Sequence, residues 1–202
     1  DTKPKVAYEE IRLGNKIIRI AGVAKGSGMI APNLATMLSF IFTDADIPSD
    51  ILKKYLKKVI TNTFNAITVD SDTSTNDMVS VFATKKVKVN SLSNIASDEA
   101  KKFEDALKQV CLDLSKQIVV DGEGAKKFVT VKVIKSNSIQ KAKKISFSIA
   151  NSPLVKTAIA GEDPNWGRII MGIGKSGEII DNKKLIIKIG EFIVAENGKI
   201  SD

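Results

Sequence analysis

KIIRIAGV, residues 16–23, followed by KGSG at residues 25–28, is the stretch from which the fold can first be read. The first eight residues are rich in β-branched side chains, which favour an extended strand. The two glycines of KGSG indicate a tight loop directly after it. We therefore predict a strand over Lys16–Val23 that ends in a sharp turn, after which the chain leads to Thr36.

Two amphipathic helices are predicted farther along the chain, because apolar residues recur there with the helical period of 3.6. The first begins at Ser49 or Asp50, either of which can cap it. The second begins near Ser97 and ends before Gly122. The apolar positions are Ile51, Leu52, Tyr55, Leu56, Val59 and Ile60 in the first helix, and Phe103, Leu107, Val110, Cys111, Leu114 and Ile118 in the second.

Two further segments alternate with period two and are predicted as strands: Phe128–Ile134 and Leu185–Ile189. ENGK at residues 196–199 is typical of a hairpin turn. Strands and helices thus mix along the chain, which favours an α/β fold, or α+β, built in layers. A length of 202 residues suits one compact structural unit.

The composition excludes several kinds of chemistry. The chain has no histidine and one cysteine, so catalytic triads with histidine, Cys-His pairs and histidine-bound zinc are ruled out. Cys111 falls on the apolar stripe of the second helix and is predicted to be a buried structural residue. No apolar run is long enough to cross a membrane, and no signal peptide is recognised. We expect a cytoplasmic location.

The formal charge of +8 does not indicate a nucleic-acid partner, because the lysines are scattered among acidic residues and only three arginines occur. Two other motifs fail on spacing. Asp70, Asp72 and Asp77 lack the glycine and glutamate of a calcium loop. Gly174-Lys175-Ser176 lacks the preceding glycine of a phosphate loop. We expect neither metal nor nucleotide.

We expect the catalytic nucleophile in the stretch GVAKGSGMIAPNLATML, residues 22–38. Without histidine, a hydroxyl can be activated by the α-amine of its own residue, if that residue is N-terminal. Thr36 would become so if its hydroxyl attacked the carbonyl of Ala35 and the resulting ester were hydrolysed. From spacing alone, a capping or packing role is the favoured interpretation of Thr36, with the nucleophile as the alternative.

Four ordered segments settle which interpretation to follow: KGSGMIAPNLATML, TFNAITVDSDTSTND, DGEGAKKFVTVKV and AGEDPNWGR, spanning residues 25–168. Together they resemble the ornithine acetyltransferases of arginine biosynthesis. The resemblance implies a self-processing, DmpA-like fold of β-sheets sandwiched with helices. It also implies cleavage between Ala35 and Thr36. Residues 1–35 would then be the tail of an α chain, and residues 36–202 part of a β chain, with the chain truncated at both ends.

The resemblance implies a ping-pong reaction in which N-acetylornithine acetylates Thr36 and glutamate then accepts the acetyl group. Lys25 and Glu123 correspond to substrate-binding residues of the family, although a solvated loop lysine is the alternative for Lys25. No cofactor is implied, but acetyl-CoA is an additional donor in some members. An α2β2 assembly of the cleaved chains is implied as well. The rival functions are a related self-processing aminopeptidase or amide hydrolase, and a basic binding module without catalysis.

Three more expectations concern supporting parts. Asn76 and Asp77 are weaker site candidates, because Asp and Asn order loops through hydrogen bonds to the backbone. Residues 163–168, DPNWGR, are expected to support the site structurally. The Thr-Gly pair that forms the oxyanion hole in the family has no counterpart in this sequence, so the piece by itself is expected to be inactive.

Overall fold

The computed structural model describes residues 1–28, 37–72 and 76–200. It divides into two compact units, Asp1–Ala125 and Lys126–Asp202, where the sequence suggested a single one. The expected boundary between residues 35 and 36 lies outside the described residues. Strands and helices mix in both units, so the predicted α/β class is confirmed.

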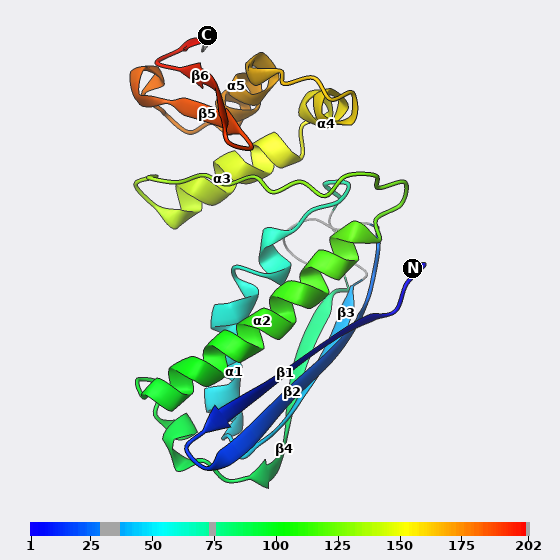
Figure 1. Ribbon diagram of the computed structural model, residues 1–202, viewed down its shortest axis with the longest axis vertical. Coiled ribbons are helices and arrows are strands. Elements are labelled where there is room, and N and C mark those ends of the chain that lie inside the picture. Colours follow the sequence, from blue (N-terminus) through cyan, green and yellow to red (C-terminus); the bar gives the residue numbers. More distant parts are fainter. Residues whose placement is uncertain (29–36, 73–75, 201–202) are drawn as a thin grey trace. The chain divides into compact units, whose positions relative to one another are not determined.

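The first unit is built on a four-stranded sheet in the order β1-β2-β3-β4 (Figure 1). Strands β1 and β2 form an antiparallel hairpin, β2 and β3 are antiparallel, and β3 and β4 are parallel. The predicted strand over residues 16–23 is confirmed as β2. The bounds are β1 Lys5–Leu13, β2 Lys16–Lys25, β3 Leu38–Ala45 and β4 Met78–Val87.

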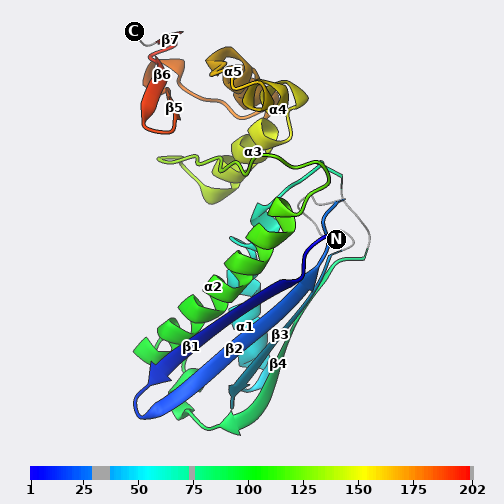
Figure 2. The ribbon, with the colours of Figure 1, turned by 45° about the vertical axis from the view of Figure 1, so that its right-hand side comes forward.

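Two helices, α1 (Ser49–Ile60) and α2 (Asp98–Val120), pack on one face of this sheet (Figures 1 and 2). Helix α1 is the crossover that parallel strands require. Its N-cap is Pro48 rather than the expected Ser49 or Asp50. The N-cap of α2 is Ser97, whose Oγ accepts a hydrogen bond of 3.0 Å from the backbone N–H of Ala100. Short 3₁₀ helices are η1 Phe64–Ala66 and η2 Asn90–Ser93.

Between sheet and helices lies the core of the first unit. Phe103 is fully buried and meets Tyr55 edge to face at 5.3 Å. Gly22 lets α2 approach β2 closely, since a Cβ there would lie 2.8 Å from Leu114 Cδ1. Cys111 is buried as predicted, and burial raises the pKa of its thiol to about 12. The apolar stripe predicted for the second helix is therefore the inner face of α2.

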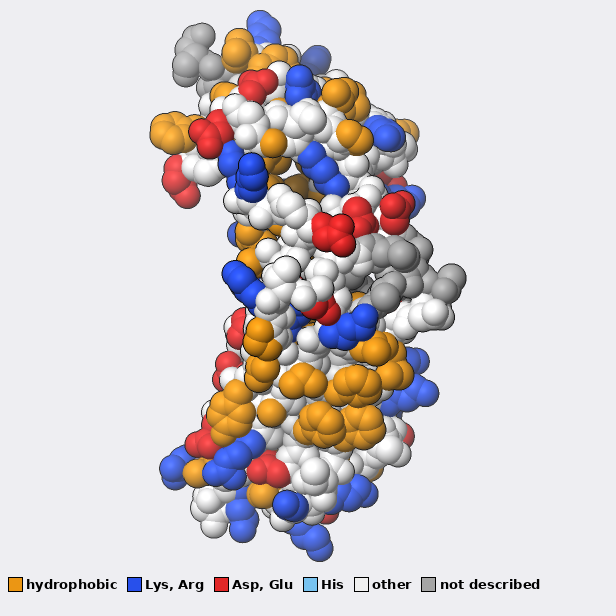
Figure 3. All heavy atoms as spheres, turned by 90° about the vertical axis from the view of Figure 1, so that its right-hand side faces the viewer, with side chains coloured by type: hydrophobic (Ala, Val, Ile, Leu, Met, Phe, Trp, Pro, Cys, Tyr) orange, Lys and Arg blue, Asp and Glu red, His pale blue; other side chains and the backbone are white. Residues whose placement is uncertain are grey.

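The opposite face of the sheet carries exposed apolar side chains, which gather into one patch in Figure 3. Phe42 and Phe82 stack there with their ring centroids 5.3 Å apart. Alternate residues of a strand point to opposite faces, so these side chains come from the same strands as the core. We call this surface the outer apolar face; its members are Val6, Tyr8, Val23, Phe42, Met78 and Phe82.

In the second unit, three helices and a three-stranded antiparallel sheet enclose a smaller core. The predicted strand over residues 185–189 is confirmed as β5, and the hairpin turn has Asn197 and Gly198 at positive φ. The bounds are α3 Ile139–Ala150, α4 Pro153–Ala160, α5 Trp166–Lys175, η3 Asn182–Lys184, β5 Ile186–Ile189, β6 Phe192–Glu196 and β7 Lys199–Ile200.

The predicted strand over residues 128–134 is wrong. Val131 and Val133 do face the second core while their neighbours are exposed, so the alternation is real. The segment nevertheless pairs with no strand in the described parts of the chain. Alternation reports which side chains are buried, whereas a strand also needs a neighbour for its backbone N–H and C=O groups.

The DPNWGR segment joins α4 to α5. Asn165 caps α5 by accepting a hydrogen bond of 3.1 Å from the N–H of Arg168. The Arg168 guanidinium donates to Leu154 O at 3.0 Å and to Thr157 Oγ1 at 2.9 Å, both in α4. These contacts give the segment a structural role within the second unit.

Across residues 1–28, 37–72 and 76–200, none of the helices combines the length and apolar character that crossing a membrane requires.

Candidate functional site

Four element ends meet at one end of the sheet in the first unit. Strand β2 ends at Lys25, β3 and β4 begin at Leu38 and Met78, and α2 ends at Val120. The predicted nucleophile Thr36 and its partner in cleavage, Ala35, lie outside the described residues. Met37, which follows Thr36, is described and buried, so the polypeptide next to the predicted nucleophile belongs to this end of the sheet.

Met37 is held on several sides. Its N–H donates a hydrogen bond of 2.6 Å to Asp77 Oδ1, and its carbonyl accepts one of 3.0 Å from the N–H of Met78. Gly26, with φ of +135°, packs against it so closely that a Cβ there would lie 3.3 Å from Met37 Cα. One glycine of the predicted KGSG loop is thus needed for a close backbone approach.

The carboxyl group of Asp77 has a raised pKa. Partial burial raises its pKa, because an ionised carboxylate is poorly solvated there. The hydrogen bond from Met37 and the positive charge of Lys25 act in the opposite direction and lower it. Asp77 and Lys25 therefore interact electrostatically.

Two further carboxylates converge beside Gly28. A Cβ on Gly28 would lie 3.7 Å from Asp70 Oδ2 and 3.9 Å from Glu123 Oε1. A Cβ on Gly122 would lie 3.0 Å from Val69 Cγ1, so the segment after α2 packs against the segment before Asp70. The tertiary structure thus joins parts of the chain that lie far apart in sequence.

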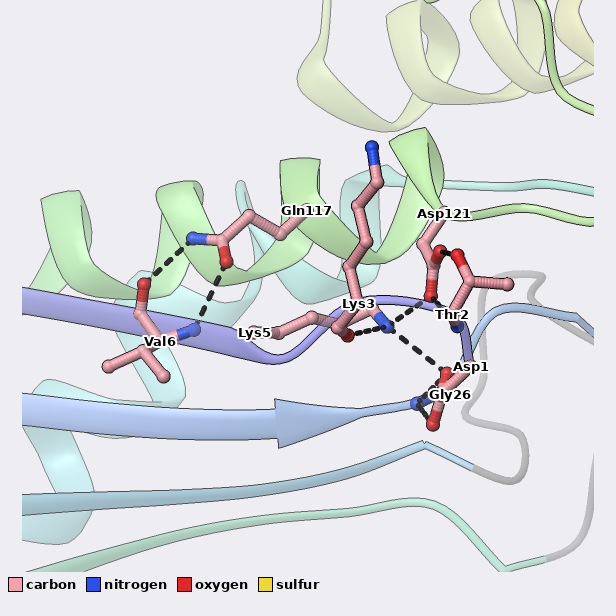
Figure 4. A network of polar contacts seen from close by, with 8 residues as sticks. All are labelled: Asp1, Thr2, Lys3, Lys5, Val6, Gly26, Gln117 and Asp121. Carbon is pink, nitrogen blue, oxygen red and sulfur yellow. Dashed lines mark hydrogen bonds and ion pairs between the residues drawn. The ribbon is translucent and has the colours of Figure 1, made fainter.

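A network of buried charge supports this end of the sheet (Figure 4). Lys5 Nζ lies 2.6 Å from Asp121 Oδ2 and 3.1 Å from Asp1 Oδ1, and the Lys5 and Asp121 side chains are 1% and 3% exposed. Asp121 also accepts hydrogen bonds from the N–H and hydroxyl of Thr2. The hydrogen bonds from Lys5 and Thr2 hold the pKa of Asp121 well below its usual range.

The network reaches both sides of the candidate site. Both carboxylate oxygens of Asp1 accept hydrogen bonds of 3.0 Å from the N–H of Gly26, next to Lys25. Asp121 immediately follows α2 and lies two residues before Glu123. On the edge strand β1, the side chain of Gln117 bonds the N–H and C=O of Val6 at 3.1 and 2.9 Å. The network ties β1, the β2 end and the α2 end together.

The structure describes the predicted site residues Lys25, Asn76, Asp77 and Glu123. Lys25, Glu123 and Asp77 all lie at this end of the sheet, and Asn76 is exposed beside Asp77. Sequence reasoning assigned Asp70 no contact with substrate and did not anticipate Lys5 and Asp121. A lysine within an alternating strand carries no signal of burial, because its partner is 116 residues away.

The exposed charged side chains at this end of the sheet suit a particular kind of ligand. Lys25 offers an ammonium group, while Asp70 and Glu123 offer carboxylates, and all three residues are solvent-exposed. Opposite charges at one site suit a ligand that carries both, such as an amino acid with a second charged group. Within the described ranges, His, Cys, Asp and Glu side chains form no cluster that could hold a metal ion.

Comparison with known proteins identifies relatives along the whole chain. The family model described as "ArgJ family" matches residues 1–202. The protein named "Arginine biosynthesis bifunctional protein ArgJ" from Brucella suis is 50% identical over 202 residues, covering 98% of this chain and 49% of that protein. The protein of the same name from Mesorhizobium japonicum is 48% identical with the same coverage. This chain spans about half the length of the curated relatives it matches.

A solved structure agrees with these matches. The crystal structure of "Arginine biosynthesis bifunctional protein argJ" from Bacillus halodurans superimposes with a TM-score of 0.76 at 41% identity, covering 82% of this chain and 78% of that chain. The resemblance inferred from the four sequence segments is confirmed. The family match over residues 1–202, together with the relatives that cover nearly all of it, shows that this chain belongs to the ArgJ family.

Proposed function

We propose that this chain is part of an acetyltransferase of arginine biosynthesis that moves an acetyl group from N-acetylornithine to glutamate. The names of the relatives support arginine biosynthesis. The observation that carries the proposal is that two sets of groups lie at one end of the sheet: Asp70 and Glu123 beside Gly28, and Lys25 with Asp77, which bonds Met37. Charged groups that could bind an amino acid thus lie at the same end of the sheet as Met37, the neighbour of Thr36.

The reaction begins with self-cleavage between Ala35 and Thr36, which frees the α-amine of Thr36. That amine takes the proton of the Thr36 hydroxyl as its oxygen attacks the acetyl carbonyl of N-acetylornithine. The tetrahedral intermediate collapses, the C–N bond breaks, and the proton passes to the departing amine of ornithine. The amino group of glutamate then attacks the acetyl ester and gives a proton to the α-amine of Thr36. That proton passes to the Thr36 oxygen as the ester C–O bond breaks, which releases N-acetylglutamate.

The charged residues have separate tasks in this scheme. The Lys25 ammonium neutralises a substrate carboxylate, as a compact point charge. The Glu123 carboxylate pairs with the side-chain ammonium of ornithine, and Asp70 beside it adds to the negative potential that favours a cation there. When glutamate replaces ornithine, Lys25 continues to hold its carboxylate. We expect Glu123→Gln to raise KM for N-acetylornithine more than KM for glutamate.

The sheet explains how two chains would remain together after cleavage. The cleavage point falls between β2 and β3, which pair in antiparallel register from Ile20–Thr43 to Lys25–Leu38. Hydrogen bonds of that ladder join the two products, and α2 packs against β1 and β2 as well. The outer apolar face offers a further surface for the polypeptide that the longer relatives contain. We therefore propose that the α and β chains stay associated after cleavage; the α2β2 arrangement is what the family resemblance implies.

The deciding experiment uses the full-length protein with Thr36 intact and with Thr36→Ala. Intact masses report cleavage, and acetyl transfer from N-acetylornithine is assayed with and without glutamate. We expect two fragments and glutamate-dependent transfer from the unaltered protein, and neither from the variant. Product release at the same rate with and without glutamate would instead identify a self-processing hydrolase. An uncleaved protein that Thr36→Ala leaves unchanged would refute the threonine mechanism.

A further inference from the structure

We propose that Asp77 is the positioning residue of the Thr36 nucleophile, acting through the backbone of Met37. The inference rests on the proposed function, and it gives a role to Asp77, which the reaction scheme leaves unused. Asp77 directly precedes β4, and Met37 directly precedes β3, the parallel neighbour of β4. A side chain at the start of one strand thus holds the start of the next.

The contacts around Met37 act as a clamp. The 2.6 Å hydrogen bond to Asp77 Oδ1 fixes its N–H, and the 3.0 Å bond from Met78 fixes its carbonyl. Gly26 packs against its Cα on a further side. A short hydrogen bond to an ionised acceptor is stronger than one between neutral groups. Met37 is consequently held in both position and orientation.

Covalent geometry carries this restraint to the nucleophile. A peptide unit is planar, so the plane that contains the Met37 N–H also contains the Cα of the preceding residue. After cleavage Thr36 has no residue before it, and the Met37 peptide is its sole covalent attachment. The clamp on Met37 then holds the peptide through which Thr36 is attached to the chain. Misplacement of reacting groups by about 1 Å can cost on the order of 10²-fold in rate.

The partial burial of the Asp77 carboxylate fits a role in positioning better than a purely structural one. Burial raises its pKa, so its ionised form is held against a solvation cost. A carboxylate that is partly buried at this cost and bonded to the backbone beside Thr36 is readily explained by what it positions. Lys25 is the charged group that interacts with it and partly offsets this cost.

The test compares four variants of the full-length protein with the unaltered one. Asp77→Ala removes the acceptor, Asp77→Asn keeps an acceptor without charge, and Asp77→Glu keeps the charge but shifts it by one methylene. Asp72→Asn is the matched control, since it removes an exposed carboxylate of the same loop. For each, the cleaved fraction, Tm, and kcat and KM of acetyl transfer are measured.

We expect Asp77→Ala to slow cleavage and to lower kcat about 100-fold with little change in KM. Asp77→Asn should recover most of that loss, and Asp72→Asn should match the unaltered protein. If Asp77→Ala does not fold, Asp77→Glu decides, with a lowered kcat at unchanged Tm expected.

Unchanged kcat in Asp77→Ala, or in Asp77→Glu where that variant decides, would overturn the inference. So would losses in kcat that merely follow losses in Tm. Failure of the proposed function is distinguishable, because the unaltered protein would then show no cleavage or no transfer.

Discussion

Within the first unit, the core beneath α1 and α2 and the end of the sheet beyond α2 differ in the kind of side chain that they bury. The core is almost entirely apolar, with Phe103, Leu107 and Leu114 fully buried. The end of the sheet buries Lys5 and Asp121 and partly buries Asp77. Burying charge costs free energy unless each charge is paired and hydrogen-bonded, and here the pairs hold the loops of the candidate site. The first region provides apolar burial, and the paired charges of the second fix the geometry of the loops.

The largest expected effect belongs to the core. Phe103→Ala removes a fully buried ring that packs against Tyr55, and it should destabilise the first unit by about 3–5 kcal/mol. Urea unfolding of the purified protein measures this. Lys101→Ala, at an exposed position of the same helix, is the control and should change stability by less than about 0.5 kcal/mol. Equal effects would mean that Phe103 is not a core residue.

The next effect tests how tightly helix and sheet approach. Gly22→Ala places a Cβ within 2.8 Å of Leu114 Cδ1 and should destabilise by about 1–3 kcal/mol. Leu114→Ala leaves a cavity, but it also removes the clashing atom. The double variant should therefore be more stable than the sum of the two single losses predicts. Strict additivity in urea unfolding would contradict the close approach of α2 to β2.

The third prediction moves to the charged end. Lys5 and Thr2 lower the pKa of Asp121, so its ionised form stabilises the fold at any pH above the ordinary aspartate pKa of about 4. That contribution should be lost as pH falls below about 4. Asp121→Asn should be less stable than the unaltered protein at pH 7, with the gap closing in acid. Parallel Tm curves from pH 7 to pH 3 would show that the pair contributes no stability.

The smallest expected effect concerns Asp77, whose ionisation changes stability with pH in the opposite direction to that of Asp121. Burial raises the pKa of Asp77, so its ionisation costs stability as pH rises above the ordinary aspartate range, and the cost is absent in acid. Asp77→Asn should therefore be as stable as the unaltered protein or slightly more stable at pH 7, with the difference shrinking toward pH 3. A variant that is clearly less stable at pH 7 would show that Asp77 serves the fold rather than the site.

Local sequence pattern by itself determined much of the fold. The 3.6-residue period of α2 and its cap at Ser97 follow from short-range effects, as does the strand at residues 16–25. Burial of Cys111 follows from the same stripe. The glycine-rich loop and the four ordered segments also indicated the family. These features need only neighbours within a few residues, and the sequence displays those directly.

Only the tertiary structure decided which distant groups meet. The Lys5–Asp121 pair, the clamp of Asp77 on Met37 and the meeting of Asp70 with Glu123 join parts of the chain far apart in sequence. Residues 128–134 alternate like a strand, yet they have no strand partner among the described residues. Periodicity reports which side of a segment is buried. The partners of its backbone and charges are set by chain segments that no local pattern contains, and these come together only as the sheet and helices pack.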